Sequence, residues 1–255
     1  MTMSKNPRTT VIKVGGSLLT RTADVENLSH HVHGLSDRGH QVVIVHGGGV
    51  EIGQIHDAIG VPTVKKAGLR VTPEDSMAIT TMVLCGLVNT RLVAGLLVTG
   101  IPALGLSGVD LGLLRCDLIN ERTLGRVGGP PRVDGALLRL LLEQGFVPVL
   151  APVSLGVDGE PANVNADTAA QSVAAALGAD SLDFVSDVDG VLDGDTPIRR
   201  ISPAEVPPLI RRSVVSGGMI PKLQAALAAL DAGVGRVRVG SLPSLRRGEA
   251  TEVQP

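Results

Sequence analysis

The chain has 255 residues, of which 44% are hydrophobic and 19% charged, and its formal net charge is −2 at pH 7. This composition supports a buried core and excludes an intrinsically disordered chain. The sequence has no basic run and only two aromatic residues, Phe146 and Phe184, so a nucleic-acid-binding protein is not expected. The 32 glycines suggest tight turns or backbone that approaches a ligand closely.

The cysteines and the length of the apolar runs predict the cellular location of the protein. Cys85 and Cys116 lie far apart without a metal-ligand spacing, so we expect two reduced thiols. No uninterrupted apolar run reaches about 18 residues, and residues 1–10 lack the apolar region of a signal peptide. We therefore expect a soluble, cytoplasmic protein that binds neither a membrane nor nucleic acid.

In chain order, short runs rich in Val and Ile alternate with segments of helical periodicity. The runs are Val11–Val14, Val42–Val45, Ala103–Leu106, Val147–Leu150, Leu182–Ser186 and Val237–Val239. Several are apolar on both faces, as are parallel strands buried between two helix layers. The intervening segments place apolar residues on one helical face, for example Val25, Leu28, Val32 and Leu35. This alternation predicts a doubly wound α/β sheet.

A longer helix is predicted from Glu74 to about Val98, with Thr72 as its N-cap and Pro73 in its first turn. Its apolar residues occupy more than one face, which fits either a buried core helix or a subunit interface. No Pro- or Ser-rich linker divides the chain, so any two lobes must be closely packed. The tail, Gly248–Val253, gives only weak evidence of a final strand.

Two glycine clusters directly follow the first two predicted strands: Gly15-Gly16 and Gly47–Gly49. Ligands bind at the carboxyl ends of strands in open α/β sheets, where glycine lets backbone N–H groups approach an anion. Neither cluster matches the Walker A or the GxGxxG pattern. Lys13 lies in the first strand, where an unpaired ammonium would be costly, and a phosphate is a natural partner. The simpler alternative is that the glycines only permit tight strand-to-helix turns.

These motifs resemble those of a known family. Lys13–Ser17 and His46–Gly49 resemble the opening motifs of the amino-acid kinase family. Four further segments are similar to its acetylglutamate kinase branch: Gly68–Thr72, Asn163–Asp167, Ser186–Leu192 and Gly217–Lys222. The resemblance implies a three-layer αβα sandwich around an open, mainly parallel sheet. It also implies two closely packed lobes, residues 1–170 for the acceptor and residues 171–255 for ATP.

The resemblance also implies an activity and a set of roles. The activity is phosphorylation of the γ-carboxylate of N-acetyl-L-glutamate by ATP, giving an acyl phosphate and ADP in arginine biosynthesis, by a homodimer. Lys13 would contact the transferring phosphoryl group, Lys222 would neutralise charge on the leaving ADP, and Asp167 would hold both ammonium groups. The remaining roles fall into two sets. Gly48, Gly49, Arg70 and Asn163 would bind the acceptor, and Gly15, Gly16, Asp187, Val188, Asp189, Gly190, Val191, Leu192, Val214, Val215 and Ser216 the nucleotide.

The chemistry agrees with these residue types. A carboxylate is ionised at neutral pH and needs no general base, which fits a sequence without a clear His/Asp or Ser/His pair. Two anions must be brought together, and this calls for fixed cations and backbone donors. Mg²⁺ would be held through the phosphates and water, without a protein ligand that we can name.

Simpler explanations exist for most of the candidates. Arg70 could form a surface ion pair, Asp167 could be a helix N-terminal acid, and Asn163 could be a turn residue. His46 is expected to be a structural histidine. We expect His30, His31 and His33 to form a solvated helix face and no metal site.

Two other functions are compatible with the sequence. One is a kinase for α-aminoadipate or glutamate attached to a carrier protein, which should need a basic rim beyond Lys65, Lys66 and Arg70. The other is a non-catalytic nucleotide or amino-acid sensor, which would not need to keep Lys13, Asp167 and Lys222 together. About ten residues precede the first strand, so we expect no arginine-sensing N-terminal helix and weak or no arginine feedback.

Overall fold

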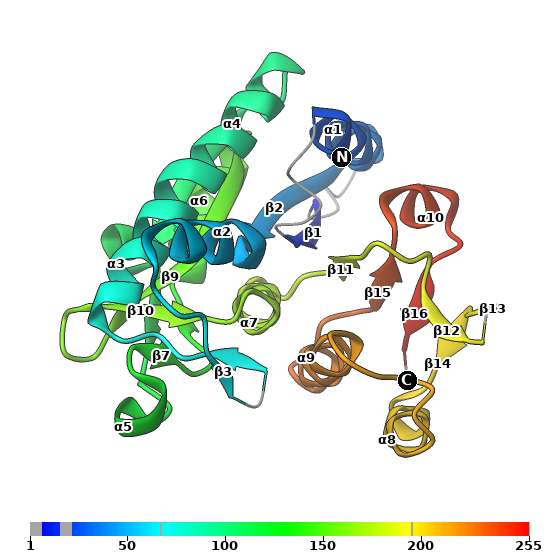
Figure 1. Cartoon of the computed structure of the whole chain (residues 1–255). Coiled ribbons are helices and arrows are strands. Elements are labelled where there is room, and N and C mark those ends of the chain that lie inside the picture. The colour runs from blue at the N-terminus through cyan, green and yellow to red at the C-terminus, as the bar shows by residue number, and fades with distance from the viewer. Residues whose placement is uncertain (1–6, 16–21, 67, 195, 255) are drawn as a thin grey trace.

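The computed structural model describes residues 7–15, 22–66, 68–194 and 196–254 (Figure 1). A large, mainly parallel sheet runs through the molecule, and all six predicted runs are strands of it. Its centre has the order β15, β11, β1, β2, β9, with β5 also paired to β9, and these neighbours are all parallel. The strands are β1 (Arg8–Val14), β2 (His40–His46), β5 (Ala103–Gly108), β9 (Val147–Gly156), β11 (Ser181–Val185) and β15 (Val237–Gly240).

Shorter strands extend this sheet at both ends. On one side they are β6 (Leu114–Cys116), β7 (Val127–Gly128), β8 (Arg132–Val133) and β10 (Pro161–Val164), and on the other β14 (Arg200–Ile201) and β16 (Thr251–Val253). The weakly predicted final strand is therefore formed, antiparallel to β15. It buries Thr251 and Val253 completely, which stabilises a strand too short to be recognised from its sequence. Two separate ribbons are β3 (Lys65–Lys66) with β4 (Leu69–Arg70), and β12 (Val191–Asp193) with β13 (Thr196–Ile198).

Helices cover both faces of the sheet. Successive side chains of β1 point to opposite faces, so Ile12 and Val11 belong to different core clusters. The Ile12 face packs against α1 (Thr22–Ser36), α2 (Gly49–Ile59), the helix from Glu74 to Val98, and α10 (Leu242–Arg247). The Val11 face packs against α6 (Gly135–Glu143), α7 (Ala166–Leu177), α8 (Val206–Arg211) and α9 (Met219–Asp231). The predicted three-layer αβα sandwich is confirmed. Among the described residues, short helices also lie in connections: α5 (Glu121–Leu124) and the 3₁₀ turns Asp110–Gly112 and Pro203–Glu205.

The predicted long helix is present but irregular. It consists of α3 (Glu74–Thr81), a π-helical segment Met82–Val88 and α4 (Asn89–Val98). Its predicted cap is wrong: the N-cap position is Pro73 without a side-chain cap, and the Thr72 hydroxyl instead donates to the Arg70 carbonyl at 2.8 Å. By length and composition alone this 25-residue helix could cross a membrane, although such a helix is weak evidence of one. Its buried residues pack against the face of the sheet that carries Ile12.

The histidines of α1 do not all face solvent, as the sequence had suggested. His31 is completely buried, and its Nε2 lies 3.3 Å from Asp183 Oδ2. Asp183, in β11, also accepts from Arg238 Nε at 2.7 Å. His31 therefore has a buried carboxylate as its partner and faces the sheet instead of the solvent. In the described ranges no three or more His, Cys, Asp or Glu side chains form a possible metal site. Position 170 lies inside α7, and the division into lobes stays a prediction.

Candidate active site

The two glycine clusters lie side by side because β1 and β2 are parallel neighbours. Val14 pairs with His46 in the sheet, so both strands end at the same level and the following loops adjoin. The Gly47 N–H donates to the Val14 carbonyl at 2.9 Å. Gly48 is the N-cap of α2 and has no side chain with which to cap it, which leaves the first N–H groups of this helix available to an anion. Gly16 of the first cluster lies outside the described residues.

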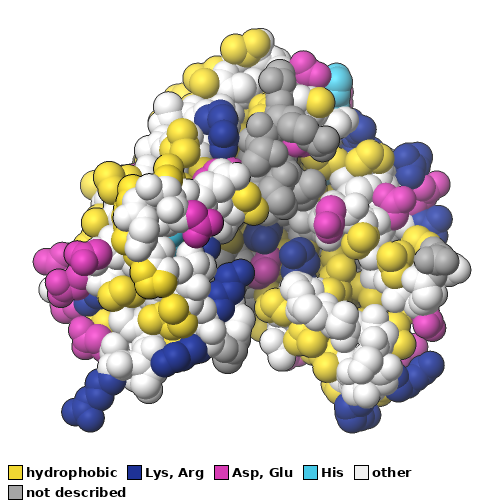
Figure 2. All heavy atoms as spheres, viewed as in Figure 1, with side chains coloured by type: hydrophobic (Ala, Val, Ile, Leu, Met, Phe, Trp, Pro, Cys, Tyr) yellow, Lys and Arg dark blue, Asp and Glu magenta, His cyan; other side chains and the backbone are white. Residues whose placement is uncertain are grey.

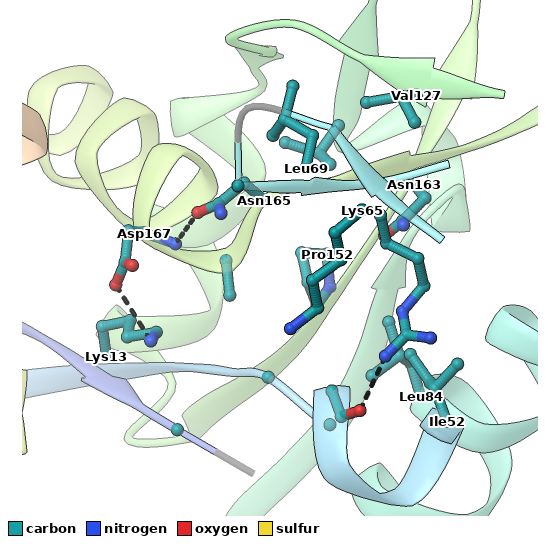
Figure 3. Close-up of a pocket in the computed structure, with 18 residues that line it drawn as sticks. Lys13, Ile52, Lys65, Leu69, Leu84, Val127, Pro152, Asn163, Asn165 and Asp167 are labelled. Carbon is teal, nitrogen blue, oxygen red and sulfur yellow. Dashed lines mark hydrogen bonds and ion pairs between the residues drawn. The ribbon is translucent and has the colours of Figure 1, made fainter. Parts of the chain in front are cut away.

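A cavity of about 240 Å³ opens at this end of the sheet (Figure 3). Its wall contains three of the glycines to which the resemblance assigns binding roles, Gly15, Gly48 and Gly49, together with Lys13, Arg70, Asn163 and Asp167. The rest of its wall comes from the residues Gly47, Ile52, Lys65, Gly68, Leu69, Leu84, Val127, Pro152, Val164, Asn165 and Ala166. The cavity thus joins elements that lie more than 150 positions apart in the sequence.

Lys13 and Asp167 form a buried ion pair at the inner end of the cavity. Nζ of Lys13 lies 2.9 Å from Oδ1 of Asp167 (Figure 3), and both side chains are less than a tenth exposed. The distance is that of an ion pair, but the Lys13 ammonium is not aligned for a hydrogen bond to Oδ1 of Asp167. The ammonium therefore keeps donor directions for a second anion.

The position of Asp167 follows from the cap of its helix. Asn165 is the N-cap of α7, and its side-chain oxygen accepts from the backbone N–H of Asp167 at 2.8 Å and of Thr168 at 3.3 Å. This cap fixes the first turn of α7 where the helix meets β1. Asp167 is thus a first-turn acid, as its alternative explanation held, and at the same time the partner of Lys13.

Lys222, in the C-terminal part of the chain, lies close enough to this ion pair for both of its members to affect its pKa. It is in the first turn of α9 and is half-buried. Burial lowers the pKa of its ammonium, the neighbouring charge of Lys13 lowers it further, and Asp167 and Asp187 act in the opposite direction. Figure 2 shows basic and acidic side chains together at the base of the hollow between the two halves of the molecule. Two cations and an aspartate therefore converge here, and the catalytic roles that the resemblance implies for them stay a prediction.

Arg70 reaches the cavity from the β3–β4 ribbon. It donates to the Thr63 hydroxyl at 3.1 Å and to the Gly49 carbonyl at 2.8 Å, so the guanidinium lies against the glycine loop. Burial lowers the pKa of Arg70, and Asp57 partly offsets this. No described carboxylate is within ion-pair distance of Arg70, which disagrees with the alternative of a surface salt bridge and leaves donors for an anionic ligand.

Asn163 lies in β10 on the opposite wall of the cavity from Lys13 (Figure 3). Its side-chain amide donates to the Thr72 hydroxyl at 3.1 Å, and its backbone N–H donates to the Arg126 carbonyl at 2.7 Å. The amide oxygen is then free of these bonds. It is a strand residue, and the alternative of a turn residue is wrong.

Of the described residues predicted to bind the nucleotide, Gly15 lines this cavity, whereas residues 187–192 and 214–216 do not. Asp187 lines a smaller recess of about 130 Å³ with Ser186 and Ser241, and Asp189 accepts a hydrogen bond from the Ser241 hydroxyl. Val191 and Val215 are at most 2% exposed and pack in the core, so only their backbones could meet a nucleotide. The other predicted residues lie in the same two stretches of chain: Val188 and Gly190 between β11 and β12, Leu192 in β12, and Val214 and Ser216 between α8 and α9.

Two cavity residues were not recognised from the sequence as members of the site. Lys65 pairs with Arg70 across the β3–β4 ribbon and points into the cavity (Figure 3). Asn165 supplies the cap described above. The signal for Asn165 was its place directly before the Ala-rich helical segment, where Asn is a preferred N-cap residue. Lys65 could not be recognised in this way. The β3–β4 ribbon that directs its side chain into the cavity has only two residues in each strand, which is too short for a periodic pattern.

Comparison with known proteins agrees with this geometry. The model of the amino acid kinase family matches residues 8–241, which is nearly the whole chain. The chain belongs to the amino acid kinase family. Its relatives include a protein named acetylglutamate kinase from Chloroflexus aggregans, 50% identical over 210 residues, which cover 81% of this chain and 83% of that protein. Another relative of that name, from Methanopyrus kandleri, is 43% identical over 96% of this chain and 99% of that protein.

A solved structure shares the fold of the family. The crystal structure of smu.665 from Streptococcus mutans has a TM-score of 0.83 and 30% sequence identity to this protein, with 96% of this chain and 98% of that chain covered. The resemblance inferred from the motifs, to the amino acid kinase family and its acetylglutamate kinase branch, is confirmed.

Proposed function

We propose that the protein transfers the γ-phosphoryl group of ATP to the γ-carboxylate of N-acetyl-L-glutamate, giving an acyl phosphate and ADP. The observation that carries this proposal is the buried Lys13–Asp167 pair, 2.9 Å apart. The cavity around it has further polar walls of glycine backbone, Lys65, Arg70, Asn163 and Asn165. The names of the relatives, acetylglutamate kinase at 43–50% identity, support the choice of acceptor.

The reacting groups need positioning and charge stabilisation more than proton transfer. The acceptor carboxylate is already ionised, so one of its oxygens can attack phosphorus directly while the bond from phosphorus to the leaving oxygen of ADP breaks. Lys13 and the N–H groups of Gly15 and Gly48 would stabilise charge on the transferring group. Lys222 would stabilise the developing charge on ADP, and Asp167 would keep both ammonium groups in place.

The acceptor's other polar groups have partners on the cavity wall. The planar guanidinium of Arg70, held by Thr63 and Gly49, suits the α-carboxylate, since its fork can bind two oxygens. The Asn163 amide oxygen, not engaged by the bond to Thr72, would accept from the acyl N–H. A ligand with both groups and a side-chain carboxylate would therefore span from Arg70 to Lys13.

The nucleotide would lie on the side of Lys222 and Asp187, over the connections that contain residues 187–192 and 214–216. Bound Mg²⁺ would neutralise phosphate charge there, and its ligands would be phosphate oxygens and water. In this arrangement residues 1–170 would bind mainly the acceptor and residues 171–255 mainly ATP.

We also propose that the protein is a cytoplasmic homodimer. The helix Glu74–Val98 exposes large apolar side chains at Met82, Leu87, Leu97 and Val98, from 48% to 88% of each. A soluble protein usually covers such a surface with another subunit. Light scattering should give twice the chain mass, and charged substitutions at Met82 and Leu87 should give a monomer. Recovery in the membrane fraction would contradict both the dimer and the cytoplasmic location.

One experiment tests the proposed activity against the two alternative functions. ADP release is measured with N-acetylglutamate, glutamate, aspartate and N-acetyl-aminoadipate in parallel, and the acyl phosphate is trapped with hydroxylamine. We expect turnover with N-acetylglutamate and a large preference for it. Turnover only with N-acetyl-aminoadipate would favour the carrier-linked acceptor, and nucleotide binding without turnover on any acceptor would favour a sensor.

A further inference from the structure

A chain of buried polar groups runs underneath the glycine loop. His46, the last residue of β2, is completely buried, and Asn89, the first residue of α4, is 6% exposed. Neither lines the cavity. The Asn89 amide nitrogen lies 3.0 Å from His46 Nε2 and 2.9 Å from the Val149 carbonyl, and His46 Nδ1 lies 3.1 Å from the Gly47 carbonyl.

These contacts determine which ring nitrogen of His46 carries the proton. A side-chain amide nitrogen has two hydrogens and cannot accept, so Asn89 donates one to Val149 and the other to Nε2. Nε2 must therefore be the acceptor of the ring, and Nδ1 carries the hydrogen. Nδ1–H then donates to the Gly47 carbonyl.

The orientation of one carbonyl fixes the direction of the next N–H. In a trans peptide the C=O of Gly47 and the N–H of Gly48 point in opposite directions. His46 holds the carbonyl toward the buried side, so the Gly48 N–H faces away from the ring, on the side of the cavity that Gly48 lines. Within the described part of the chain, no backbone carbonyl accepts from this N–H.

The packing around Gly48 and Asn89 leaves room for this hydrogen-bonded arrangement only where glycines are present. Gly48 packs so closely on the π-helical segment that a Cβ would lie 2.6 Å from Leu84 Cδ2 and 3.2 Å from Val88 Cγ2. Asn89 follows this segment directly, and π-helical turns occur frequently at functional sites. In β5, a Cβ at Gly105 would lie 2.2 Å from Asn89 Oδ1, so this position must be glycine for Asn89 to reach His46.

We propose that His46 and Asn89 are positioning residues, which hold the Gly47–Gly48 peptide so that the Gly48 N–H points at the reacting oxygens. Asn89 fixes the tautomer of His46, and His46 fixes the peptide. This inference rests on the proposed function for the identity of those oxygens, whereas the tautomer and the peptide orientation do not depend on it.

The test combines two substitutions that differ in the hydrogen bond they keep. His46→Asn places an amide near the position of Nδ1 and retains a donor for Gly47, whereas His46→Gln places its amide near Nε2 and loses that donor. We expect kcat to fall by less than about 10-fold for His46→Asn and by about 100-fold or more for His46→Gln, as for removal of one oxyanion donor. KM for ATP and acceptor should change by less than about 3-fold, since the contact strengthens in the transition state.

His31→Gln is the matched control, because His31 is equally buried but pairs with Asp183 away from the cavity. It should lower the thermal midpoint and leave kcat per folded molecule unchanged. Equal losses of kcat in the two His46 variants, or a loss in His31→Gln as large as in His46→Gln, would overturn the proposal.

A measurement on the unmodified protein completes the test. Nitrogen-15 NMR of the histidine rings should show His46 protonated at Nδ1 and not at Nε2 at neutral pH. A proton on Nε2 would overturn the inference even if every variant fails to fold. If the unmodified protein turns over no acceptor, the proposed function fails, and the NMR result still decides the tautomer.

Discussion

The ammonium of Lys13 and the carboxylate of Asp167 face each other at 2.9 Å, and each side chain is less than a tenth exposed. Lys13 comes from the middle of the sheet and Asp167 from the first turn of α7. Loss of one member of a buried ion pair leaves an uncompensated charge, which costs more than loss of both. This asymmetry separates the structural role of the pair from its catalytic role.

For this reason the single variant Lys13→Met and the double variant Lys13→Met/Asp167→Asn should differ in stability but not in activity. We expect the single variant to be less stable by roughly 3 kcal/mol and the double variant to regain most of that. Both should lose kcat by at least about 100-fold. Denaturant unfolding and steady-state kinetics measure the two effects, and recovery of turnover in the double variant would show that Lys13 only balances Asp167.

The pH dependence of nucleotide binding should report on Lys222. Its pKa is lowered from the ordinary 10.5 by burial and by Lys13, so its positive charge is lost at a lower pH than that of an exposed lysine. As pH rises through that pKa, kcat/KM for ATP should fall. Lys222→Arg keeps its charge above pH 12, so the decline should move to higher pH even if the variant is slower. An unchanged alkaline decline would assign it to another group.

Arg70 should determine acceptor affinity without affecting ATP. Arg70→Lys removes the planar fork, and we expect KM for N-acetylglutamate to rise by about 10- to 100-fold, equivalent to about 1.4–2.8 kcal/mol, with KM for ATP within a factor of about 3. Thr63→Val is the control, because it keeps the guanidinium and removes the hydroxyl that lies 3.1 Å from Arg70 and 3.2 Å from His56 Nδ1. It should raise the acceptor KM by less than about 10-fold. A parallel rise in KM for ATP would contradict this assignment.

Gly105 should tolerate no side chain. A Cβ there would lie 2.2 Å from Asn89 Oδ1, so Gly105→Ala should lower the free energy of unfolding by about 1–3 kcal/mol and reduce kcat by displacing Asn89. Gly86→Ala is the matched control, since a Cβ there meets nothing within 4 Å. It should change neither quantity unfavourably. Equal effects of the two substitutions would show that close packing at Gly105 is unimportant.

His46 should contribute to stability in a defined pH window. Burial lowers its pKa from 6.5 to about 4, an effect that the hydrogen bond to Gly47 partly opposes. Because the folded pKa lies below the unfolded one, this contribution is complete above about pH 6.5 and is lost as pH falls toward 4, by roughly 3 kcal/mol in all. The difference in unfolding free energy between the unmodified protein and His46→Asn should shrink over this window. A constant difference would mean that His46 titrates normally.

The layers of the fold and many of the residues that line the cavity could be predicted from the sequence. Strands apolar on both faces and helices apolar on one face can only be buried together as helix, sheet and helix, and the core confirms this. Glycines that directly follow strands are local features as well. They predicted where an anion would bind, and Lys13, Gly48, Gly49, Arg70, Asn163 and Asp167 do line one cavity.

Tertiary structure alone decided the contacts between distant segments. His31 meets Asp183 across 152 positions, and Asn89 meets His46 across 43. Both contacts depend on which strands are neighbours in the sheet. The contact of Asn89 also depends on the π-helical segment that precedes α4, because this segment sets the direction in which Asn89 points. Periodicity reports whether a face is buried, but not what polar group lies opposite. The sequence therefore predicted a structural role for His46, and only the packing around it indicated that this role is to aim the glycine loop.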